Sequence, residues 1–82
     1  MLTLRIISPE KTEYDGPASI VSVPGTQGRF QILTDHAPLI SSLEKGVVEY
    51  DTDGTRHQLP ILGGFVEVQK NVVSLCVEVK EY

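Results

Sequence analysis

The sequence predicts an all-β fold, a flattened antiparallel β-sandwich or barrel of about eight to ten short strands. Three observations support this prediction. Apolar and polar residues alternate along several segments, most clearly from Val73 to Val79. Turn-forming residues recur about every ten positions, and no segment of comparable length has the periodicity of a helix. We therefore expect one domain over residues 1–82, without a helical part.

In the N-terminal half, the alternation of apolar and polar residues predicts the strands, and a change in its phase predicts an irregularity. Leu2 to Ile6 places apolar side chains at every second position and predicts the first strand. From Ala18 to Val23 the alternation changes phase at Ile20-Val21, which predicts a β-bulge there, because one inserted residue switches the inward-facing set. Two short strands are expected over residues 30–33 and 39–43.

The C-terminal half reads as a series of hairpins. Asp53-Gly54 is a strong hairpin signal, because both residues tolerate a positive φ. The returning strand is expected to run from Thr55 to about Leu59, where Pro60 either ends it or marks it as an edge strand. Gly63-Gly64 is expected to precede the next strand, and Lys70-Asn71 to form the last turn. The side chains expected in the core include Leu4, Ile6, Ile20, Val48, Val66, Val68, Leu75 and Val77.

The composition excludes several classes of partner. The formal net charge is −4 and no Lys/Arg cluster is present, so we expect neither nucleic acid nor an anionic membrane surface as a partner. The longest apolar stretch, from Ile61 to Val66, is far shorter than the ~20 residues that span a bilayer, so no direct membrane insertion is expected. Cys76 has no partner for a disulfide, which favours a cytoplasmic location.

No motif in the sequence predicts catalysis or a cofactor. The two histidines and one cysteine lack the close spacing of metal ligands, so no metal site is expected. His36 follows Asp35, but adjacent residues usually point apart, so we interpret His36 as a turn or interface residue rather than a general base. The loop from Gly25 to Gly28 lacks both a following Lys-Ser/Thr and a helix N-terminus, so it is no phosphate site. The chain is therefore predicted to be a non-enzyme.

Three sequence blocks resemble a known family. They are V-x-V-P-G-x-x-G-x-F-x-I-L-x-x-H-A-P-L-I from Val21 to Ile40, the segment from Leu43 to Val48, and the segment from Gly63 to Val73. In this order they resemble the N-terminal β-sandwich of the ε subunit of bacterial F-type ATP synthases, the counterpart of mitochondrial δ. The resemblance implies a non-catalytic subunit of the central stalk (rotor). It would link the γ subunit to the polar loops of the c ring, and so couple ion translocation to ATP synthesis, at the cytoplasmic face of the bacterial inner membrane.

The resemblance also implies a subunit interface built on two turns. The interface residues that it implies are Gly25, Gly28, Arg29, Phe30, Asp35, His36, Ala37, Pro38 and Leu39. Many relatives have an acidic residue where this chain has Arg29, and a glycine where it has Gln31. In this chain Asp35 or Glu44 would then supply the negative charge for a polar contact with the ring.

Typical ε subunits continue after the last strand with a helical hairpin that can inhibit rotation and in some relatives binds ATP. The sequence ends at Tyr82, so we expect no C-terminal helical hairpin and no nucleotide binding by this chain. The alternative function is a free-standing ligand-binding or carrier β-domain, which rests on size and fold class alone. Lys45 and Lys70 lie near turns, but neither has the sequence context of a biotinyl or lipoyl lysine.

Overall fold

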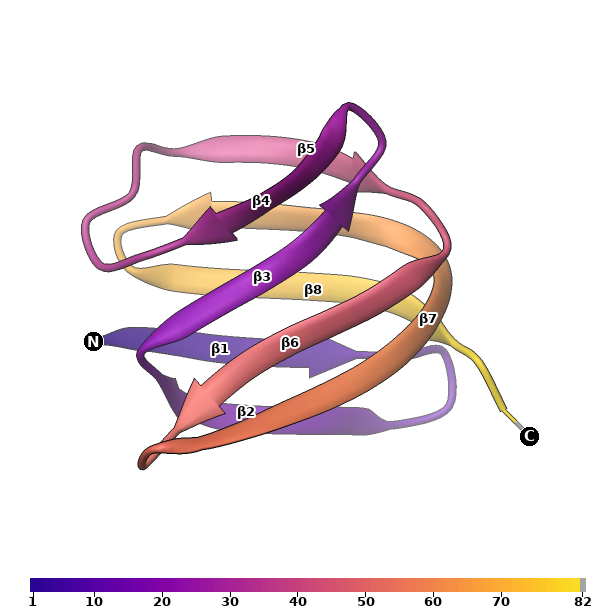
Figure 1. Ribbon diagram of the computed structural model, residues 1–82, viewed down its shortest axis with the longest axis horizontal. Coiled ribbons are helices and arrows are strands. Elements are labelled where there is room, and N and C mark those ends of the chain that lie inside the picture. Colours follow the sequence, from indigo (N-terminus) through magenta and orange to yellow (C-terminus); the bar gives the residue numbers. More distant parts are fainter. Residues whose placement is uncertain (82) are drawn as a thin grey trace.

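The computed structural model describes residues 1–81, and these residues form eight strands and no helix (Figure 1). The strands are β1 (Leu2–Ile7), β2 (Thr12–Ala18), β3 (Ile20–Gly25), β4 (Gly28–Ile32), β5 (Leu39–Leu43), β6 (Gly46–Thr52), β7 (Thr55–Gln69) and β8 (Val72–Val79). The predicted all-β fold is confirmed.

The strands form two layers that share the long strand β7. Its first part pairs with β6, and its second part pairs with β5 and β8. One layer therefore has the order β2-β1-β8-β7-β5, and the other has the order β4-β3-β6-β7 (Figure 1). Among the described strands every pair is antiparallel, as predicted, except β1 with β8, which run parallel. The long chain between β1 and β8 permits this arrangement, which a hairpin does not.

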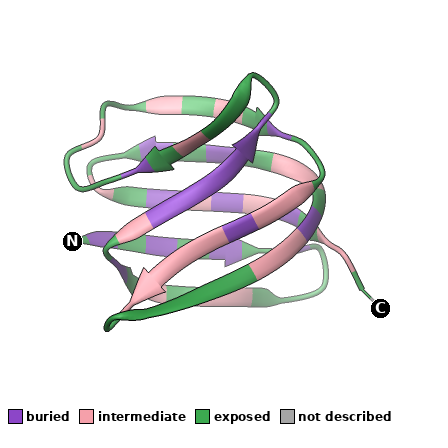
Figure 2. Ribbon diagram, viewed as in Figure 1, coloured by how far each residue is buried: buried purple, intermediate pink, exposed green. Residues whose placement is uncertain are grey.

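The core lies between the two layers and consists of aliphatic side chains (Figure 2). The expected core positions that are buried are Leu4, Ile6, Val48, Val66, Val68, Leu75 and Val77. The expectation for Ile20 is wrong, because Ile20 is only half-buried and the adjacent Val21 is fully buried instead.

The predicted bulge at Ile20-Val21 is also wrong. The register of β3 is continuous there against both β4 and β6. Ala18 ends β2 in one layer and Ile20 begins β3 in the other, so the chain turns a corner at the exposed Ser19. This corner, rather than an inserted residue, changes the phase of the alternation.

The two predicted hairpin turns have the backbone geometry that their sequences indicate. At Asp53 and Gly54 φ is 50° and 77°, and at Lys70 and Asn71 it is 51° and 63°. Positive φ at both central residues matches the right-handed twist of the flanking strands. The turn chemistry at both positions was therefore predictable from local sequence.

Of the two predicted roles of Pro60, ending the strand is wrong, because β7 continues through it to Gln69. The carbonyl oxygen of Pro60 accepts a hydrogen bond from the Lys80 N–H at 3.0 Å, so its backbone polar groups face away from β6. In an antiparallel ladder the N and C=O of one residue point to the same side. The missing N–H of Pro60 therefore removes no bond to β6.

Gly63 and Gly64 lie inside β7 instead of preceding a strand. The register of β7 against β8 shifts between Ile61 and Gly63, which marks an irregularity of the bulge type. At Gly64 φ is +148°, and a Cβ there would collide with the carbonyl oxygen of Cys76. Here two strands approach so closely that only a glycine fits.

Candidate subunit interface

The first predicted turn, at the β3–β4 hairpin, is held firmly by the rest of the domain. Gly25 is buried, and a Cβ at this position would lie 2.8 Å from the ring of Phe30, which packs half-buried against the core. At the tip, the Thr26 N–H donates to the Ser42 carbonyl at 3.1 Å, and the two hydroxyls are 2.8 Å apart. Gly25 and much of Phe30 are therefore unavailable to a partner, whereas Gly28 is exposed.

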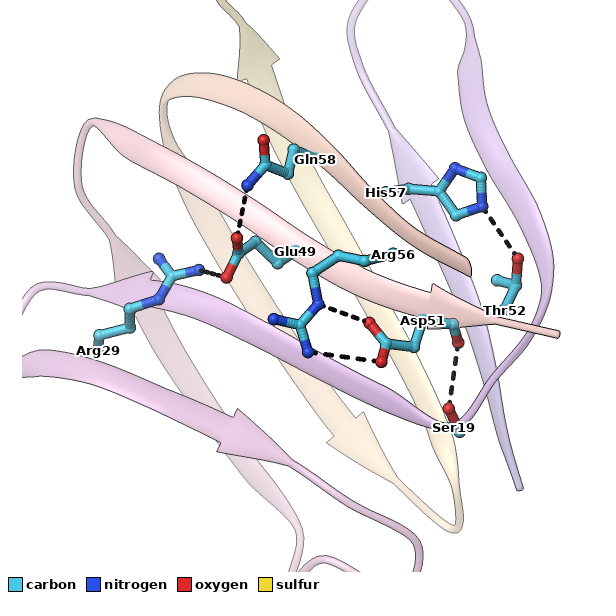
Figure 3. Close-up of polar contacts among 8 residues, drawn as sticks. All are labelled: Ser19, Arg29, Glu49, Asp51, Thr52, Arg56, His57 and Gln58. Atoms are coloured by element: carbon cyan, nitrogen blue, oxygen red, sulfur yellow. Dashed lines mark hydrogen bonds and ion pairs between the residues drawn. The ribbon is translucent and has the colours of Figure 1, made fainter. Parts of the chain in front are cut away.

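Arg29 reaches from β4 across the surface to β6 (Figure 3). Its guanidinium donates to the Val47 carbonyl at 2.7 Å and forms an ion pair with Glu49 at 3.2 Å. Asp51 and Arg56 form a similar pair at 2.9 Å on the neighbouring hairpin. Arg29 therefore binds two groups of β6 and so connects β4 with β6. Its charge is already paired within the domain.

Glu49 is the centre of this polar contact. Its second carboxylate oxygen accepts a hydrogen bond from the Gln58 side chain at 2.7 Å. The hydrogen bond from Gln58, followed by the charge of Arg29, lowers the pKa of Glu49. Because the pKa is lower in the folded state, the stability contributed by this carboxylate is present at neutral pH and is lost as the pH falls through the folded-state pKa.

We expect Gln58→Ala to raise the pKa of Glu49 towards its ordinary value, because the substitution removes the largest single cause of the shift. Carboxyl NMR titration of the folded protein measures the effect directly. Arg56→Ala is the matched control, since Arg56 acts on Glu49 only through its more distant charge and should change this pKa less. An unchanged pKa in the Gln58 variant would contradict the assignment.

The second predicted turn, between β4 and β5, is fastened to the β7–β8 turn. The Asp35 N–H donates to the Asn71 side-chain oxygen at 2.6 Å, and the Asn71 amide donates back to the Asp35 carboxylate at 3.1 Å. Within the loop, the His36 N–H bonds the Leu33 carbonyl, and His36 Nδ1 lies 2.8 Å from the Ala37 oxygen. Asn71, read from the sequence only as a turn residue, therefore helps to hold this candidate surface.

The structure separates the two halves of the predicted interface. The β3–β4 hairpin and the loop that holds Asp35 to Pro38 lie at opposite ends of β4 (Figure 1). Five residues in an extended strand span about 17 Å. The predicted residues therefore form two small surfaces rather than one patch.

An exposed apolar surface that the sequence reading missed lies on the outer side of β1, β8 and β7. Ile7 is opposite Cys76, which is opposite Phe65, and we call these three residues the apolar row. Phe65 is 49% exposed, Ile7 38%, and Ile40 on the adjacent β5 is 74% exposed. The sequence contained a signal for this surface in the alternation of apolar and polar residues. Ile7 and Phe65 occupy positions at which β1 and β7 otherwise carry polar residues. Cys76, read as a packed side chain, is half-buried in this row.

The described residues contain no group of three or more His, Cys, Asp or Glu side chains placed to hold a metal ion. Within the same range, no helix is present that is long and apolar enough to cross a membrane.

Comparison with known proteins identifies the family. Residues 1–81 match the family model "ATP synthase, Delta/Epsilon chain, beta-sandwich domain". The chain is 42% identical over 80 residues to the ATP synthase epsilon chain of Synechococcus elongatus, covering 98% of this chain and 58% of that protein. It is 43% identical over 79 residues to the epsilon chain of Desulfitobacterium hafniense, covering 96% and 60%. The chain thus spans somewhat more than half the length of these curated relatives.

Two solved structures share the fold. A chain of the Euglena gracilis mitochondrial ATP synthase, in a structure of its OSCP, F1 and c ring, superimposes with a TM-score of 0.87 at 22% identity, covering 93% of this chain and 49% of that one. A chain of the Tetrahymena thermophila central stalk and c ring gives 0.79 at 15% identity, covering 94% and 63%. These likenesses show the fold, and the family match with the curated relatives shows that the chain belongs to the ATP synthase Delta/Epsilon family, as its β-sandwich domain.

Proposed function

We propose that this chain is a non-catalytic central-stalk subunit of an F-type ATP synthase. In this role it links the γ subunit to the c ring and so helps to couple ion translocation to ATP synthesis. The family match supports the proposal, as do the structural neighbours, which come from ATP synthase assemblies containing a c ring. The comparisons offer no support for the alternative of a free-standing carrier domain. We place the subunit at the cytoplasmic face of the bacterial inner membrane, where its partners hold it.

The observation that carries the proposal is the apolar row with the neighbouring Ile40. Ile7, Phe65 and Ile40 are exposed on the outer sheet face. Ile7, Pro9, Phe65 and the half-buried Cys76 line a shallow hollow of about 370 Å³ there. Exposed apolar side chains gathered on one face are typical of a protein contact, because covering them removes apolar surface from water. We assign this face to the γ subunit.

We assign the polar contact with the c ring to the turn that contains Asp35 and His36. Both residues are held by hydrogen bonds within the domain. A surface that is already ordered loses little conformational entropy when a partner binds. We do not assign Arg29 to an ion pair with the c ring, because its charge is already paired with Glu49.

Purification of the native complex tests the proposal. A tagged copy of this chain, expressed in its source cells and purified in mild detergent, is expected to bring down γ and the c ring in fixed proportion. An unrelated tagged β-sandwich of similar size is the control. Recovery of the tagged chain without γ would contradict the proposed function.

A further inference from the structure

Two carboxylates flank the apolar row on the same outer face of the sheet. Glu67 follows Phe65 by two residues in β7, and Glu78 follows Cys76 by two residues in β8. Alternate residues of a strand point to the same side, and the residue between the members of each pair is buried. Both glutamates are exposed. This face therefore has an apolar centre and a negative charge at each end.

The register of β7 against β8 places the two carboxylates on opposite sides of the row. Glu67 is opposite Ser74 on one side. Glu78 is opposite Gly63 on the other side, because the two strands are antiparallel. Along β7, Gly63 and Glu67 are four residues apart, which in an extended strand is about 13 Å. The hollow at the apolar row lies between these two positions.

Neither of these carboxylates is paired within the domain. In the described part of the chain the ion pairs join the arginines to Asp15, Glu49 and Asp51. Lys70 lines a surface hollow together with Glu67 but forms no ion pair with it. Water solvates such charges in the free chain. A partner that covers the apolar row removes part of this water, which is unfavourable unless the partner supplies cations in return.

We propose that the surface of γ that binds the apolar row carries an apolar side chain between two basic groups. The apolar side chain enters the hollow beside Phe65, and the basic groups, about 13 Å apart, pair with Glu67 and Glu78. This inference rests on the proposed function, because it names the chemistry of the γ surface at the face assigned to γ. Complementary charges around an apolar centre fix the register of a contact and exclude wrong partners.

The charges of this face favour a basic partner over a second copy of this chain. Arg5 lies on the same face, but it is already paired with Asp15 at 3.8 Å. Two copies that met through this face would therefore bring unpaired carboxylates together. Each copy also carries a formal net charge of −4, which opposes their association.

Charge reversal tests the proposal. Glu67→Lys and Glu78→Lys are each expected to weaken binding to a rotor complex of γ and c ring, stripped of this chain, by more than about tenfold, because like charges would then face each other. Asp53→Lys is the matched control, since it makes the same change of charge at an exposed position of the β6–β7 hairpin. The backbone there has a positive φ, as it does at Lys70, so a lysine is accepted. The control should bind as the original chain does.

The salt dependence of binding separates a charge contact from an effect of side-chain size. The affinity of the unaltered chain should fall as the KCl concentration rises, and it should fall less steeply in a Glu67→Gln/Glu78→Gln double variant. An unchanged salt dependence in the double variant would overturn the inference. Binding by either Lys variant as tight as that of the control would overturn the pairing at that carboxylate. Failure of the unaltered chain to bind the rotor complex would instead overturn the proposed function itself.

Discussion

Gly64→Ala is expected to lower the free energy of unfolding by about 3–5 kcal/mol, through strain at a positive φ together with a steric overlap. At Gly64 φ is +148°, and a Cβ would collide with the Cys76 carbonyl oxygen and lie 2.8 Å from Val77 Cα. These atoms belong to the backbone of a central strand and cannot move aside without breaking the β7–β8 ladder. Because a domain of this size is stabilised by only about 4–12 kcal/mol, the variant should be close to unfolded.

Gly63→Ala is the matched control for this prediction. A Cβ at Gly63 would have an ordinary contact of 3.5 Å with the Leu43 carbonyl oxygen, and the backbone there does not adopt a positive φ. Alanine at such a position changes stability by less than about 1 kcal/mol. Urea denaturation followed by circular dichroism measures both variants. Equal stability of the two would show that the close approach of the strands is not a constraint.

Phe65→Asp is expected to weaken assembly with γ by about a hundredfold or more while leaving the isolated domain folded. Phe65 is 49% exposed, so the aspartate remains hydrated in the free chain. In the complex the same carboxylate would be buried against an apolar partner, and the aromatic contact of the row would be lost. Co-purification and a direct binding titration with the stripped rotor complex measure the effect.

Thr55→Asp is the control for this effect, since it adds the same charge at an exposed position of the β6–β7 hairpin, away from the apolar row. It should assemble normally. If the Phe65 variant also assembles normally and retains its melting temperature, the apolar row is not the surface that binds γ. That result would leave the family assignment intact and would move the interface to another face.

Much of the fold was predictable from local sequence, because the deciding physical effects act between residues that are close in the chain. Alternation of apolar and polar residues predicted β1 and β8, whose apolar sets are largely buried. Asp53-Gly54 and Lys70-Asn71 predicted two hairpin turns through their tolerance of a positive φ. The three sequence blocks predicted the family, which the family match confirms.

By itself, then, the sequence determined β1, β8, two tight turns, most of the core and the family. Only the tertiary structure decided the parallel pairing of β1 with β8, the passage of β7 through Pro60, and the binding of Arg29 by Glu49. Each of these depends on which distant segment lies beside a given residue. Neither periodicity nor turn propensity specifies such a neighbour, because both describe a residue and its immediate chain, whereas long-range pairing is selected by the packing of the whole domain.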